Sequence, residues 1–430
     1  MNRREFLAFA ASTLPAARLA RATDEPAADI TLRIAEINAD LGNGHVVKTL
    51  AYNGQVPGPL LRITEGKTVT VDVVNQSRRP ELVHWHGFHI PPEVDGTHEE
   101  GTPHVQPNDT RRYSFTANPT GTRWYHTHAM AGQNTRIGTY SGQFGMAVVE
   151  PRDNPARYDA EFPIILHDWE PFFRAEMEGD VDYRLFTING KVLGSAEPIR
   201  VKSGQRVLFR VLNASATKAH RLALAGHSFQ VLALDGNAVP KQASVPVLDL
   251  APAERVDALV EMKNPGVWIF GELEDAQRIG GAGIVVEYAG AKGAARWTPP
   301  PPDFHWDLAA FGEPRDLPAS ESIVPFVIEP GKNGYLWAIN GKSWPHTDEV
   351  HLTSGIRNRL VFDNRSDMGH PVHLHRHTFE LGSGVRKDVL LVPSHSKLEV
   401  DVLADSPGPS LFHCHHQLHM DFGFMALLRY

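Results

Sequence analysis

Side chains able to bind metal crowd the C-terminal end of the chain, in the run His413-Cys414-His415-His416 followed by His419. Cys414 is the only cysteine among 430 residues, so no internal disulfide is open to it. A lone thiol beside several imidazoles has the setting of a metal ligand. These residue types therefore indicate metal chemistry at this end of the chain.

The expected local structure would divide this run between two sites. If the strand suggested by residues 410–412 continues, His413 and His415 point to one face and Cys414 to the other. Cys414, with His419 and one imidazole from elsewhere, would form the two-histidine, one-cysteine set that favours a blue copper centre. His413 and His415 would belong to a second site behind it. For this run alone, a histidine-rich tail with incidental metal binding is the simpler alternative.

The N-terminal segment has the parts of an export signal. Arg3-Arg4 precedes a short apolar run and Ala20-Arg21-Ala22, which resembles a cleavage site. We exclude residues 1–22 from the fold and expect a periplasmic or otherwise exported protein that uses the twin-arginine route, with an ordinary secretory leader as the alternative. No later stretch approaches the ~20 apolar residues that cross a bilayer, so we expect no stable membrane anchor.

Charge and composition restrict the class of protein and its partners. Loss of residues 1–22 removes four arginines and one glutamate and moves the formal net charge from −8 to about −11. An acidic chain is a poor partner for nucleic acid or an anionic membrane surface. The length exceeds one typical domain. Thirty-six glycines and 32 prolines among short β-branched runs predict strands and turns rather than helices.

A repeat divides the chain into three parts. Residues 62–75, 200–213 and 351–364 each carry a glycine followed nine residues later by an asparagine, with apolar residues alternating between them as in a strand. An Asn-Gly pair precedes each copy at a similar distance. Copies spaced this widely do not form a solenoid, so the repeat predicts three domains of one fold.

Four pairs of the form His-x-His follow this repeat. At nine and eleven residues past the asparagine, the outer copies have histidines, whereas the middle copy has Leu222 and Leu224. We therefore expect the outer domains to supply metal ligands and the middle domain to be a copper-free spacer. His220 and His227 would be ordinary core or surface residues. On strands, the pairs could project eight imidazoles toward one cluster. The eight are His84, His86, His126, His128, His373, His375, His413 and His415.

At this point the sequence resembles the multicopper oxidases, a family that includes laccases, bilirubin oxidases and bacterial cuprous oxidases. The matching segments are 84–87 (His-Trp-His-Gly), 124–128 (Trp-Tyr-His-Thr-His), 370–375 (His-Pro-Val-His-Leu-His) and 413–415 with His419. The resemblance implies an all-β protein built of three cupredoxin-like Greek-key sandwich or barrel domains.

We place the three domains at residues 28–150, 158–289 and 310–430. A run of glycine and alanine followed by four prolines, between the last two, is typical of a linker.

The resemblance also implies four coppers per chain and a ligand set for each. The type 1 ligands would be His370, Cys414 and His419, and the type 2 ligands His84 and His373. The two type 3 coppers would take His86, His126, His128, His375, His413 and His415. The histidines close to these motifs are expected around the ligands or at the surface: His89, His98, His104, His377 and His416.

The activity implied by the family is oxidation of a reducing substrate coupled to reduction of O2 to water. Electrons would pass from the type 1 copper through Cys414 to the three-copper cluster. Asp95 matches the family's proton-relay aspartate, with a plain Asp-Gly turn as the alternative. Many bacterial relatives carry a glutamate after the last histidine ligand, whereas this chain has Met420 there and only Asp421 as a nearby substitute.

The sequence allows two hypotheses about the reducing substrate, an aromatic molecule or a metal ion. Cuprous oxidases often carry a methionine-rich insert, because thioethers favour Cu(I), but the eight methionines here are scattered. We therefore favour a laccase-like oxidase of phenols or aromatic amines over a metal-ion oxidase. A non-catalytic copper-binding or scaffold protein is the remote alternative, because all ten histidines and the cysteine are present.

The position of the weak axial ligand of the type 1 copper holds Phe424 instead of methionine. Phenylalanine cannot coordinate, so the sequence predicts a high reduction potential. Met425 would reach the copper only if the strand slipped by one residue, which reverses the faces of all its side chains.

Overall fold

The computed structural model describes residues 26–152, 157–173, 181–301, 303–313, 320, 322–332 and 334–430. The export signal expected at residues 1–22 lies outside them. In the part of the chain that the structure describes, no helix is long and apolar enough to cross a membrane.

The first domain packs a sheet of order β2-β1-β4-β6 on a sheet of order β3-β8-β7-β5. Its strands are β1 (Ile30–Gly42), β2 (His45–Tyr52), β3 (Leu61–Thr64), β4 (Thr68–Asn75), β5 (Val83–His86), β6 (Thr110–Thr116), β7 (Gly121–Thr127) and β8 (Phe144–Glu150). Two short helices, α1 (Pro92–Asp95) and η1 (Gly138–Tyr140), lie in its loops.

The middle domain packs a sheet of order β10-β9-β12-β17-β14-β15 on one of order β11-β19-β18-β13-β16. Its strands are β9 (Ala160–Phe173), β10 (Val181–Ile188), β11 (Ile199–Val201), β12 (Arg206–Asn213), β13 (His220–Leu224), β14 (Phe229–Leu234), β15 (Asn237–Val245), β16 (Leu248–Leu250), β17 (Arg255–Glu261), β18 (Val267–Glu272) and β19 (Gly283–Tyr288). The helix α2 (Asp275–Ile279) follows β18, and η2 (Leu308–Phe311) lies in the connection to the third domain.

The third domain packs a sheet of order β21-β20-β23-β28-β25-β26 on one of order β22-β30-β29-β24-β27. Its strands are β20 (Ser322–Pro330), β21 (Trp337–Ile339), β22 (Val350–His351), β23 (Arg357–Asn364), β24 (His370–Leu374), β25 (Phe379–Glu380), β26 (Arg386–Lys387), β27 (Val389–Val392), β28 (Lys397–Leu403), β29 (Ser410–Cys414) and β30 (Met425–Arg429). The helix α3 (Gln417–Asp421) follows β29.

The repeated strands β4, β12 and β23 have the same role in all three sandwiches. Each pairs in parallel with the first strand of its domain, which is β1, β9 or β20. In β4 and β23 every second side chain is buried, as the alternating pattern predicts for a strand with one face on the core. The fold is therefore three cupredoxin-like β-sandwiches in one chain, as predicted.

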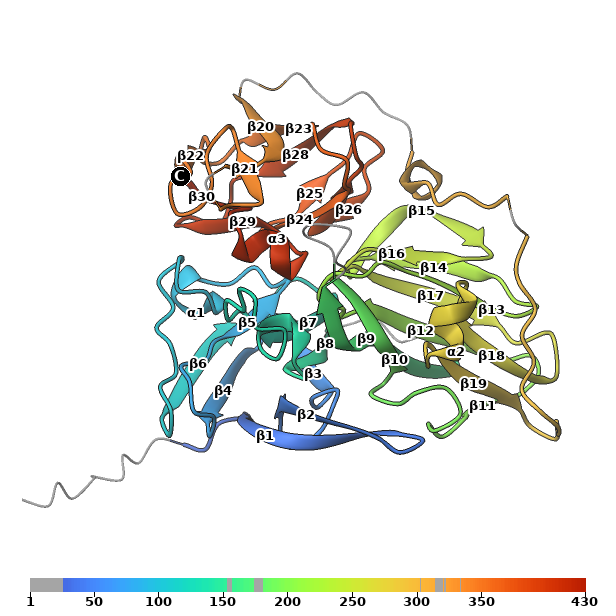
Figure 1. Cartoon of the computed structure of the whole chain (residues 1–430). Helices are drawn as coiled ribbons and strands as arrows, with labels where there is room; N and C mark the ends of the chain where they lie inside the picture. The colour runs from blue at the N-terminus through green and yellow to red at the C-terminus, as the bar shows by residue number, and fades with distance from the viewer. Residues whose placement is uncertain are drawn as a thin grey trace, which may run out of the picture.

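The third sandwich lies against both of the others (Figure 1), with the first in blue and cyan, the middle one in green and yellow, and the third in orange and red. The helix α3 lies where the red and cyan parts meet. One buried apolar cluster contains residues of all three domains, including Trp124, Leu212 and Val389. Burial of this apolar surface holds the domains in one fixed arrangement.

In each domain the side-chain amide of the repeat asparagine donates a hydrogen bond to a backbone oxygen of a neighbouring segment. The pairs are Asn75 with Val105 O, Asn213 with Leu250 O and Asn364 with Val392 O. Across the sheet from these three acceptors lie Glu81, His220 and His370. Those three side chains therefore occupy one and the same place in the three domains.

The loop after the repeat asparagine is one residue longer in the middle domain, and this shifts its register. The asparagine amide also reaches a backbone oxygen five residues on, at Lys218, instead of four residues on, at Arg79 and Met368. Our expectation that Leu222 and Leu224 stand where the outer domains have histidines is therefore wrong.

The true counterparts are alanines. Ala223 pairs with Gly271 across the sheet, as His373 pairs with His413 in the third domain. Ala225 then stands in the place of His375. His220 follows Asn213 by seven residues and His370 follows Asn364 by six, so the longer loop places these two histidines in the same register.

Candidate metal centre

Cys414, His370 and His419 bring three donor atoms together in the core of the third domain. The Cys414 Sγ lies 3.8 Å from His370 Nδ1 and 3.6 Å from His419 Nδ1, and the two Nδ1 atoms lie 3.1 Å apart. All three residues are fully buried. The strands β24 and β29 pair side by side, while α3 returns His419 to the end of β29. This is a trigonal two-histidine, one-cysteine set.

The neighbours of this set fix its rings and cover it. Ser366 Oγ lies 2.9 Å from His370 Nε2, which leaves Nδ1 facing Cys414. The Phe424 ring is 5.0 Å from the His370 ring and shares the apolar core of Cys414. Met425 packs in a different cluster. The strand alternation thus turns Phe424, not Met425, toward the donor atoms.

The four His-x-His pairs meet at the contact between the first and third domains. His84 pairs with His126 between β5 and β7, and His373 with His413 between β24 and β29. Every one of the eight histidines is buried. The His84 ring stacks on that of His375 at 3.9 Å, and the ring of His86 on that of His373 at 3.8 Å. The eight imidazoles expected from the sequence therefore form one cluster.

Most of these rings are held at one nitrogen so that the other faces the cluster. Nδ1 donates to a backbone oxygen in four of them: His84 to Asp95, His126 to Thr127, His373 to Asp388 and His413 to Cys414. In addition, His375 Nδ1 donates to Asp95 Oδ2 at 2.8 Å. Such bonds orient an imidazole for metal binding.

Several nitrogens that face inward have no hydrogen-bond partner among the described residues. They are His84 Nε2, His128 Nε2, His373 Nε2, and both ring nitrogens of His415. A buried polar atom without a partner costs free energy. Metal ions at the centre of the cluster would satisfy these atoms, so the donor set fits the metal that it was predicted to bind.

Burial keeps the imidazoles neutral, as metal ligands must be. It lowers the pKa of His84 to about 4 and that of His413 to about 3. The pKa values of His86, His126 and His373 lie well below the usual range for the same reason, and the nearby imidazoles and the Arg255 guanidinium disfavour a further positive charge there. Burial also raises the pKa of the Cys414 thiol, so a bound cation is needed to stabilise its thiolate.

Two buried carboxyl groups lie beside the cluster. Asp95 Oδ2 is 3.0 Å from His84 Nδ1, and Glu100 Oε1 is 3.7 Å from His375 Nδ1 and accepts from Leu411 N at 2.5 Å. Burial raises the pKa of Asp95 to about 7 and that of Glu100 well above its usual range. Both acids therefore hold a proton to higher pH than a solvent-exposed carboxyl does, and they lie next to two histidines.

The other expected acid, Asp421, lies farther from the rings. Its carboxylate accepts from Ala131 N, Gly132 N and Gln417 Nε2. Burial raises the pKa of Asp421 to about 7. Gln417 lines a cavity of about 10 Å³, with Met420 and four of the cluster histidines, which has room for roughly one water molecule.

The histidines expected outside the metal sites are placed as follows. His98 and His104 are exposed. His377 Nε2 lies at hydrogen-bond distance, 2.6 Å, from the Tyr430 hydroxyl. His89 contacts Thr378. His416 stacks on His419 with ring centres 3.7 Å apart, so it supports a donor ring from behind.

Three buried residues at the cluster had no signal in the sequence. Glu100 lies in a loop, Asp388 precedes β27, and Arg255 opens β17 of the middle domain. No spacing or repeat singles them out. Only the packing of the domains brings them to the histidines.

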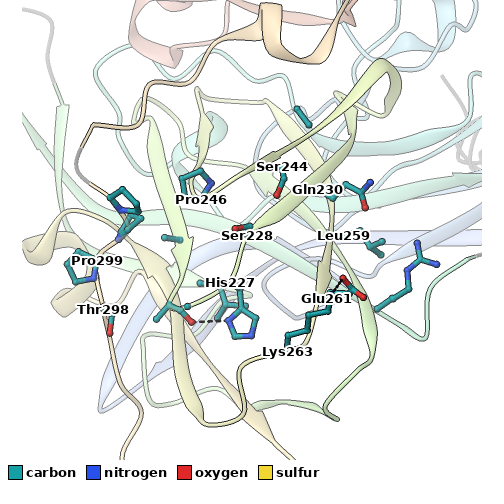
Figure 2. A pocket seen from close by; sticks show the side chains of 18 of the residues that line it. His227, Ser228, Gln230, Ser244, Pro246, Leu259, Glu261, Lys263, Thr298 and Pro299 are labelled. Carbon is teal, nitrogen blue, oxygen red and sulfur yellow. Dashed lines mark hydrogen bonds and ion pairs between the residues drawn. The ribbon is translucent and has the colours of Figure 1, made fainter.

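A much larger cavity lies elsewhere, in the middle domain. Its volume is about 950 Å³, and its lining includes His227, Ser228, Glu261, Lys263 and the proline run from Pro299 (Figure 2). Ala223 and Ala225, the counterparts of two cluster histidines, also line it. The middle domain thus has an open cleft where the outer domains have the cluster.

Sequence comparison identifies relatives along almost the whole chain. Family profiles described as multicopper oxidase match residues 33–154, 161–290 and 316–430. The chain is 31% identical to the multicopper oxidase MmcO of Mycobacterium tuberculosis, over 97% of this chain and 90% of that protein. It is 24% identical to copper resistance protein A of Escherichia coli, over 93% and 92% of the two chains.

Solved structures agree with these relatives. A multi-copper oxidase from Pseudomonas thermotolerans superimposes with a TM-score of 0.75 at 25% identity, over 94% of this chain and all of that one. A laccase from Botrytis aclada reaches a TM-score of 0.79 at 21% identity, over 93% and 87% of the two chains, which compares the fold alone. The chain belongs to the multicopper oxidase family, whose members are copper-dependent oxidoreductases that use O2.

Proposed function

We propose that the chain binds four coppers at the two donor sets. The type 1 copper takes His370, Cys414 and His419, and the type 2 copper takes His84 and His373. The type 3 pair takes His86, His126, His128, His375, His413 and His415. The orphaned inward-facing nitrogens and the trigonal cysteine set support this division.

One observation gives the strongest support for electron transfer between the two donor sets. In β29, Cys414 faces the core of the third domain, while His413 and His415 on either side of it face the cluster. A single tripeptide therefore joins the two donor sets through covalent bonds. Bound copper would supply one-electron redox chemistry at the first set and four-electron reduction of O2 to water at the second.

Acidic side chains of the protein supply the protons that this reaction consumes. Reduction of one O2 to two waters consumes four protons, and Asp95 stands at hydrogen-bond distance from His84 and His375. Burial raises the pKa of Asp95 to about 7 and that of Glu100 above its usual range, so a proton is available there near neutral pH. Asp95 thus acts as the proton donor, with Glu100 as its partner, and Asp421 acts at most through Gln417.

The reducing substrate is a phenol or an aromatic amine. The chain is 30% identical over 59% of its length to a protein named Laccase-15 from rice. The Trp337 ring contacts the His370 and His419 rings, with ring centres 4.3 and 4.7 Å away, so a largely buried aromatic side chain borders the proposed type 1 ligands. Oxidation of a metal ion is the second candidate, because one relative is named for copper resistance.

We also propose that residues 1–22 direct twin-arginine export to the periplasm, and that the domains span residues 28–150, 158–289 and 310–430. The family profiles and the six sheets support this division of the chain.

Reconstitution of the purified protein with copper tests the function. We expect four coppers per chain, a strong blue absorption, and oxygen uptake with phenols that exceeds uptake with Cu(I). A protein that takes up one copper or none contradicts the four-copper proposal. Faster uptake with Cu(I) than with every phenol instead makes it a metal-ion oxidase.

A further inference from the structure

The middle domain reaches the cluster through a buried ion pair. Arg255, the first residue of β17, donates from Nη1 to Asp388 Oδ1 at 2.5 Å and from Nη2 to Asp388 Oδ2 at 2.6 Å. Both side chains are buried, at 0% and 1% exposure. A two-point pair between a guanidinium and a carboxylate fixes the plane as well as the position of the carboxylate.

Asp388 contacts one histidine from each outer domain. Its Oδ1 lies 3.1 Å from His86 Nε2, and its backbone oxygen accepts from His373 Nδ1 at 2.7 Å. These contacts leave His86 Nδ1, 3.4 Å from His126 Nε2, and the unpartnered His373 Nε2 to face the cluster. The same residue therefore sets which nitrogen of two proposed ligands is free.

The middle domain also holds the chain on both sides of Asp388. Asp235 accepts from Lys387 Nζ at 2.9 Å and from Val389 N at 3.1 Å. Lys387 also pairs with Glu254 at 3.0 Å. Residues 387–389 are thus tied to the middle domain at three consecutive positions.

The glycine after His86 makes room for this arrangement. A Cβ atom at Gly87 would lie 2.6 Å from Asp388 Oδ2 and 2.7 Å from Arg255 Nη2. Any larger residue would push the pair away from the histidines. The glycine of the first His-Trp-His-Gly motif is therefore required by a contact between the other two domains, besides its positive φ of 81°.

We propose that Arg255 is a positioning residue of the copper cluster, which it orders through Asp388 by fixing His86 and His373. The inference rests on the proposed four-copper function and assigns the copper-free middle domain an active part in it. Loss of a residue that orients metal ligands in this way lowers metal affinity roughly 10- to 100-fold.

Arg210 offers a matched control. It is also a largely buried arginine of the middle domain, and it pairs with Glu161 and Asp257 at 2.8 Å each. It also donates to Thr122 of the first domain at 2.9 Å. Its bonds reach none of the cluster histidines. The Arg210→Met variant therefore measures how much stability is lost with a buried arginine between the domains that has no contact with the cluster.

The experiment compares the wild type with Arg255→Met, Arg255→Lys and Arg210→Met. Each is loaded with Cu(II) and assayed for copper per chain, the near-ultraviolet absorption of the type 3 pair, the type 2 electron paramagnetic resonance signal and the blue absorption. Thermal unfolding of the copper-free proteins is measured in parallel. We expect Arg255→Met to bind cluster copper roughly 10- to 100-fold more weakly and to keep its blue absorption, and Arg255→Lys to fall between it and the wild type.

The outcomes separate this inference from the proposed function. Equal cluster signals in Arg255→Met and Arg210→Met, at similar thermal stability, would overturn the positioning role alone. If Arg255→Met does not fold, Arg255→Lys with wild-type affinity and signals would overturn it too. Absence of type 2 and type 3 signals in the wild type would instead contradict the four-copper proposal.

Discussion

His220 in the middle domain occupies the place that His370 occupies in the third. Both begin the strand that follows the repeat asparagine, and a serine hydroxyl contacts Nε2 of each, from Ser215 at 3.1 Å and Ser366 at 2.9 Å. Glu272 correspondingly takes the place of Cys414, because each lies across from the residue two positions after the histidine. The middle domain thus keeps the framework of the proposed type 1 site, with a carboxylate in place of the thiol.

In the middle domain, ion pairs between His220 and two carboxylates occupy the position of the metal-binding set of the third domain. His220 lies 3.0 Å from Glu272 Oε2 and 3.1 Å from Asp168 Oδ1. Burial by itself would lower the pKa of His220, but the two carboxylates raise it to about 10. A charged imidazolium between two carboxylates therefore stands where copper and thiolate are proposed in the third domain.

His220→Gln should lower the free energy of unfolding by about 3 kcal/mol at pH 6, since it leaves two buried carboxylates without their cation. The folded pKa lies above the ordinary value of 6.5, so this stabilisation is complete below about pH 6.5 and disappears as the pH rises through about 10. Chemical unfolding at several pH values measures the difference between the two proteins. His227→Gln, at a half-buried histidine of the same domain, is the control, and a difference that grows with pH would contradict the assignment.

Cys414→Ser should abolish the blue absorption and the oxidation of every substrate, because the proposed function makes the thiolate both a copper ligand and the electron path to the cluster. The eight cluster histidines are untouched, so we expect about three coppers per chain. Copper analysis, absorption and oxygen uptake measure these effects. Turnover that survives in this variant would show that electrons reach the cluster by another path.

Asp95→Asn should lower turnover by roughly 100-fold, in the range typical of a lost general acid. The amide is nearly the same size and keeps an oxygen for His375, so the copper content and the blue absorption should stay unchanged. Steady-state oxygen uptake and copper analysis of the same preparation make the comparison. A variant with wild-type rates at every pH would leave Asp95 with only its role at the end of α1.

Phe424→Met should lower the reduction potential of the type 1 copper, because an axial donor added where phenylalanine supplies none stabilises Cu(II) relative to the three-ligand site. Oxidation of the least easily oxidised phenols should slow accordingly. Met425→Leu is the control, since Met425 packs with Leu411 and Met420 away from the donor atoms. Redox titration of the blue absorption decides the point, and a raised potential in Met425→Leu would reverse the assignment.

The sequence alone determined the fold class and the gathering of the histidines. Strand alternation is a local property, so His413 and His415 had to face away from Cys414 once this segment was a strand. The threefold repeat carried that reasoning from one domain to the next. The same reasoning failed at Leu222, because one added loop residue shifts a strand's register without leaving a signal in its pattern.

Only the tertiary structure decided what surrounds the cluster. Arg255 and Asp388 are 133 positions apart, and His86 and Asp388 are 302 positions apart. Their contacts depend on how three sandwiches pack, which no local pattern encodes. The same is true of Asp95 and Glu100, because burial is the largest cause of their raised pKa values and depends on how the domains pack. Residue spacing therefore predicted the ligands, whereas the packing of domains selected the groups that orient them and supply protons.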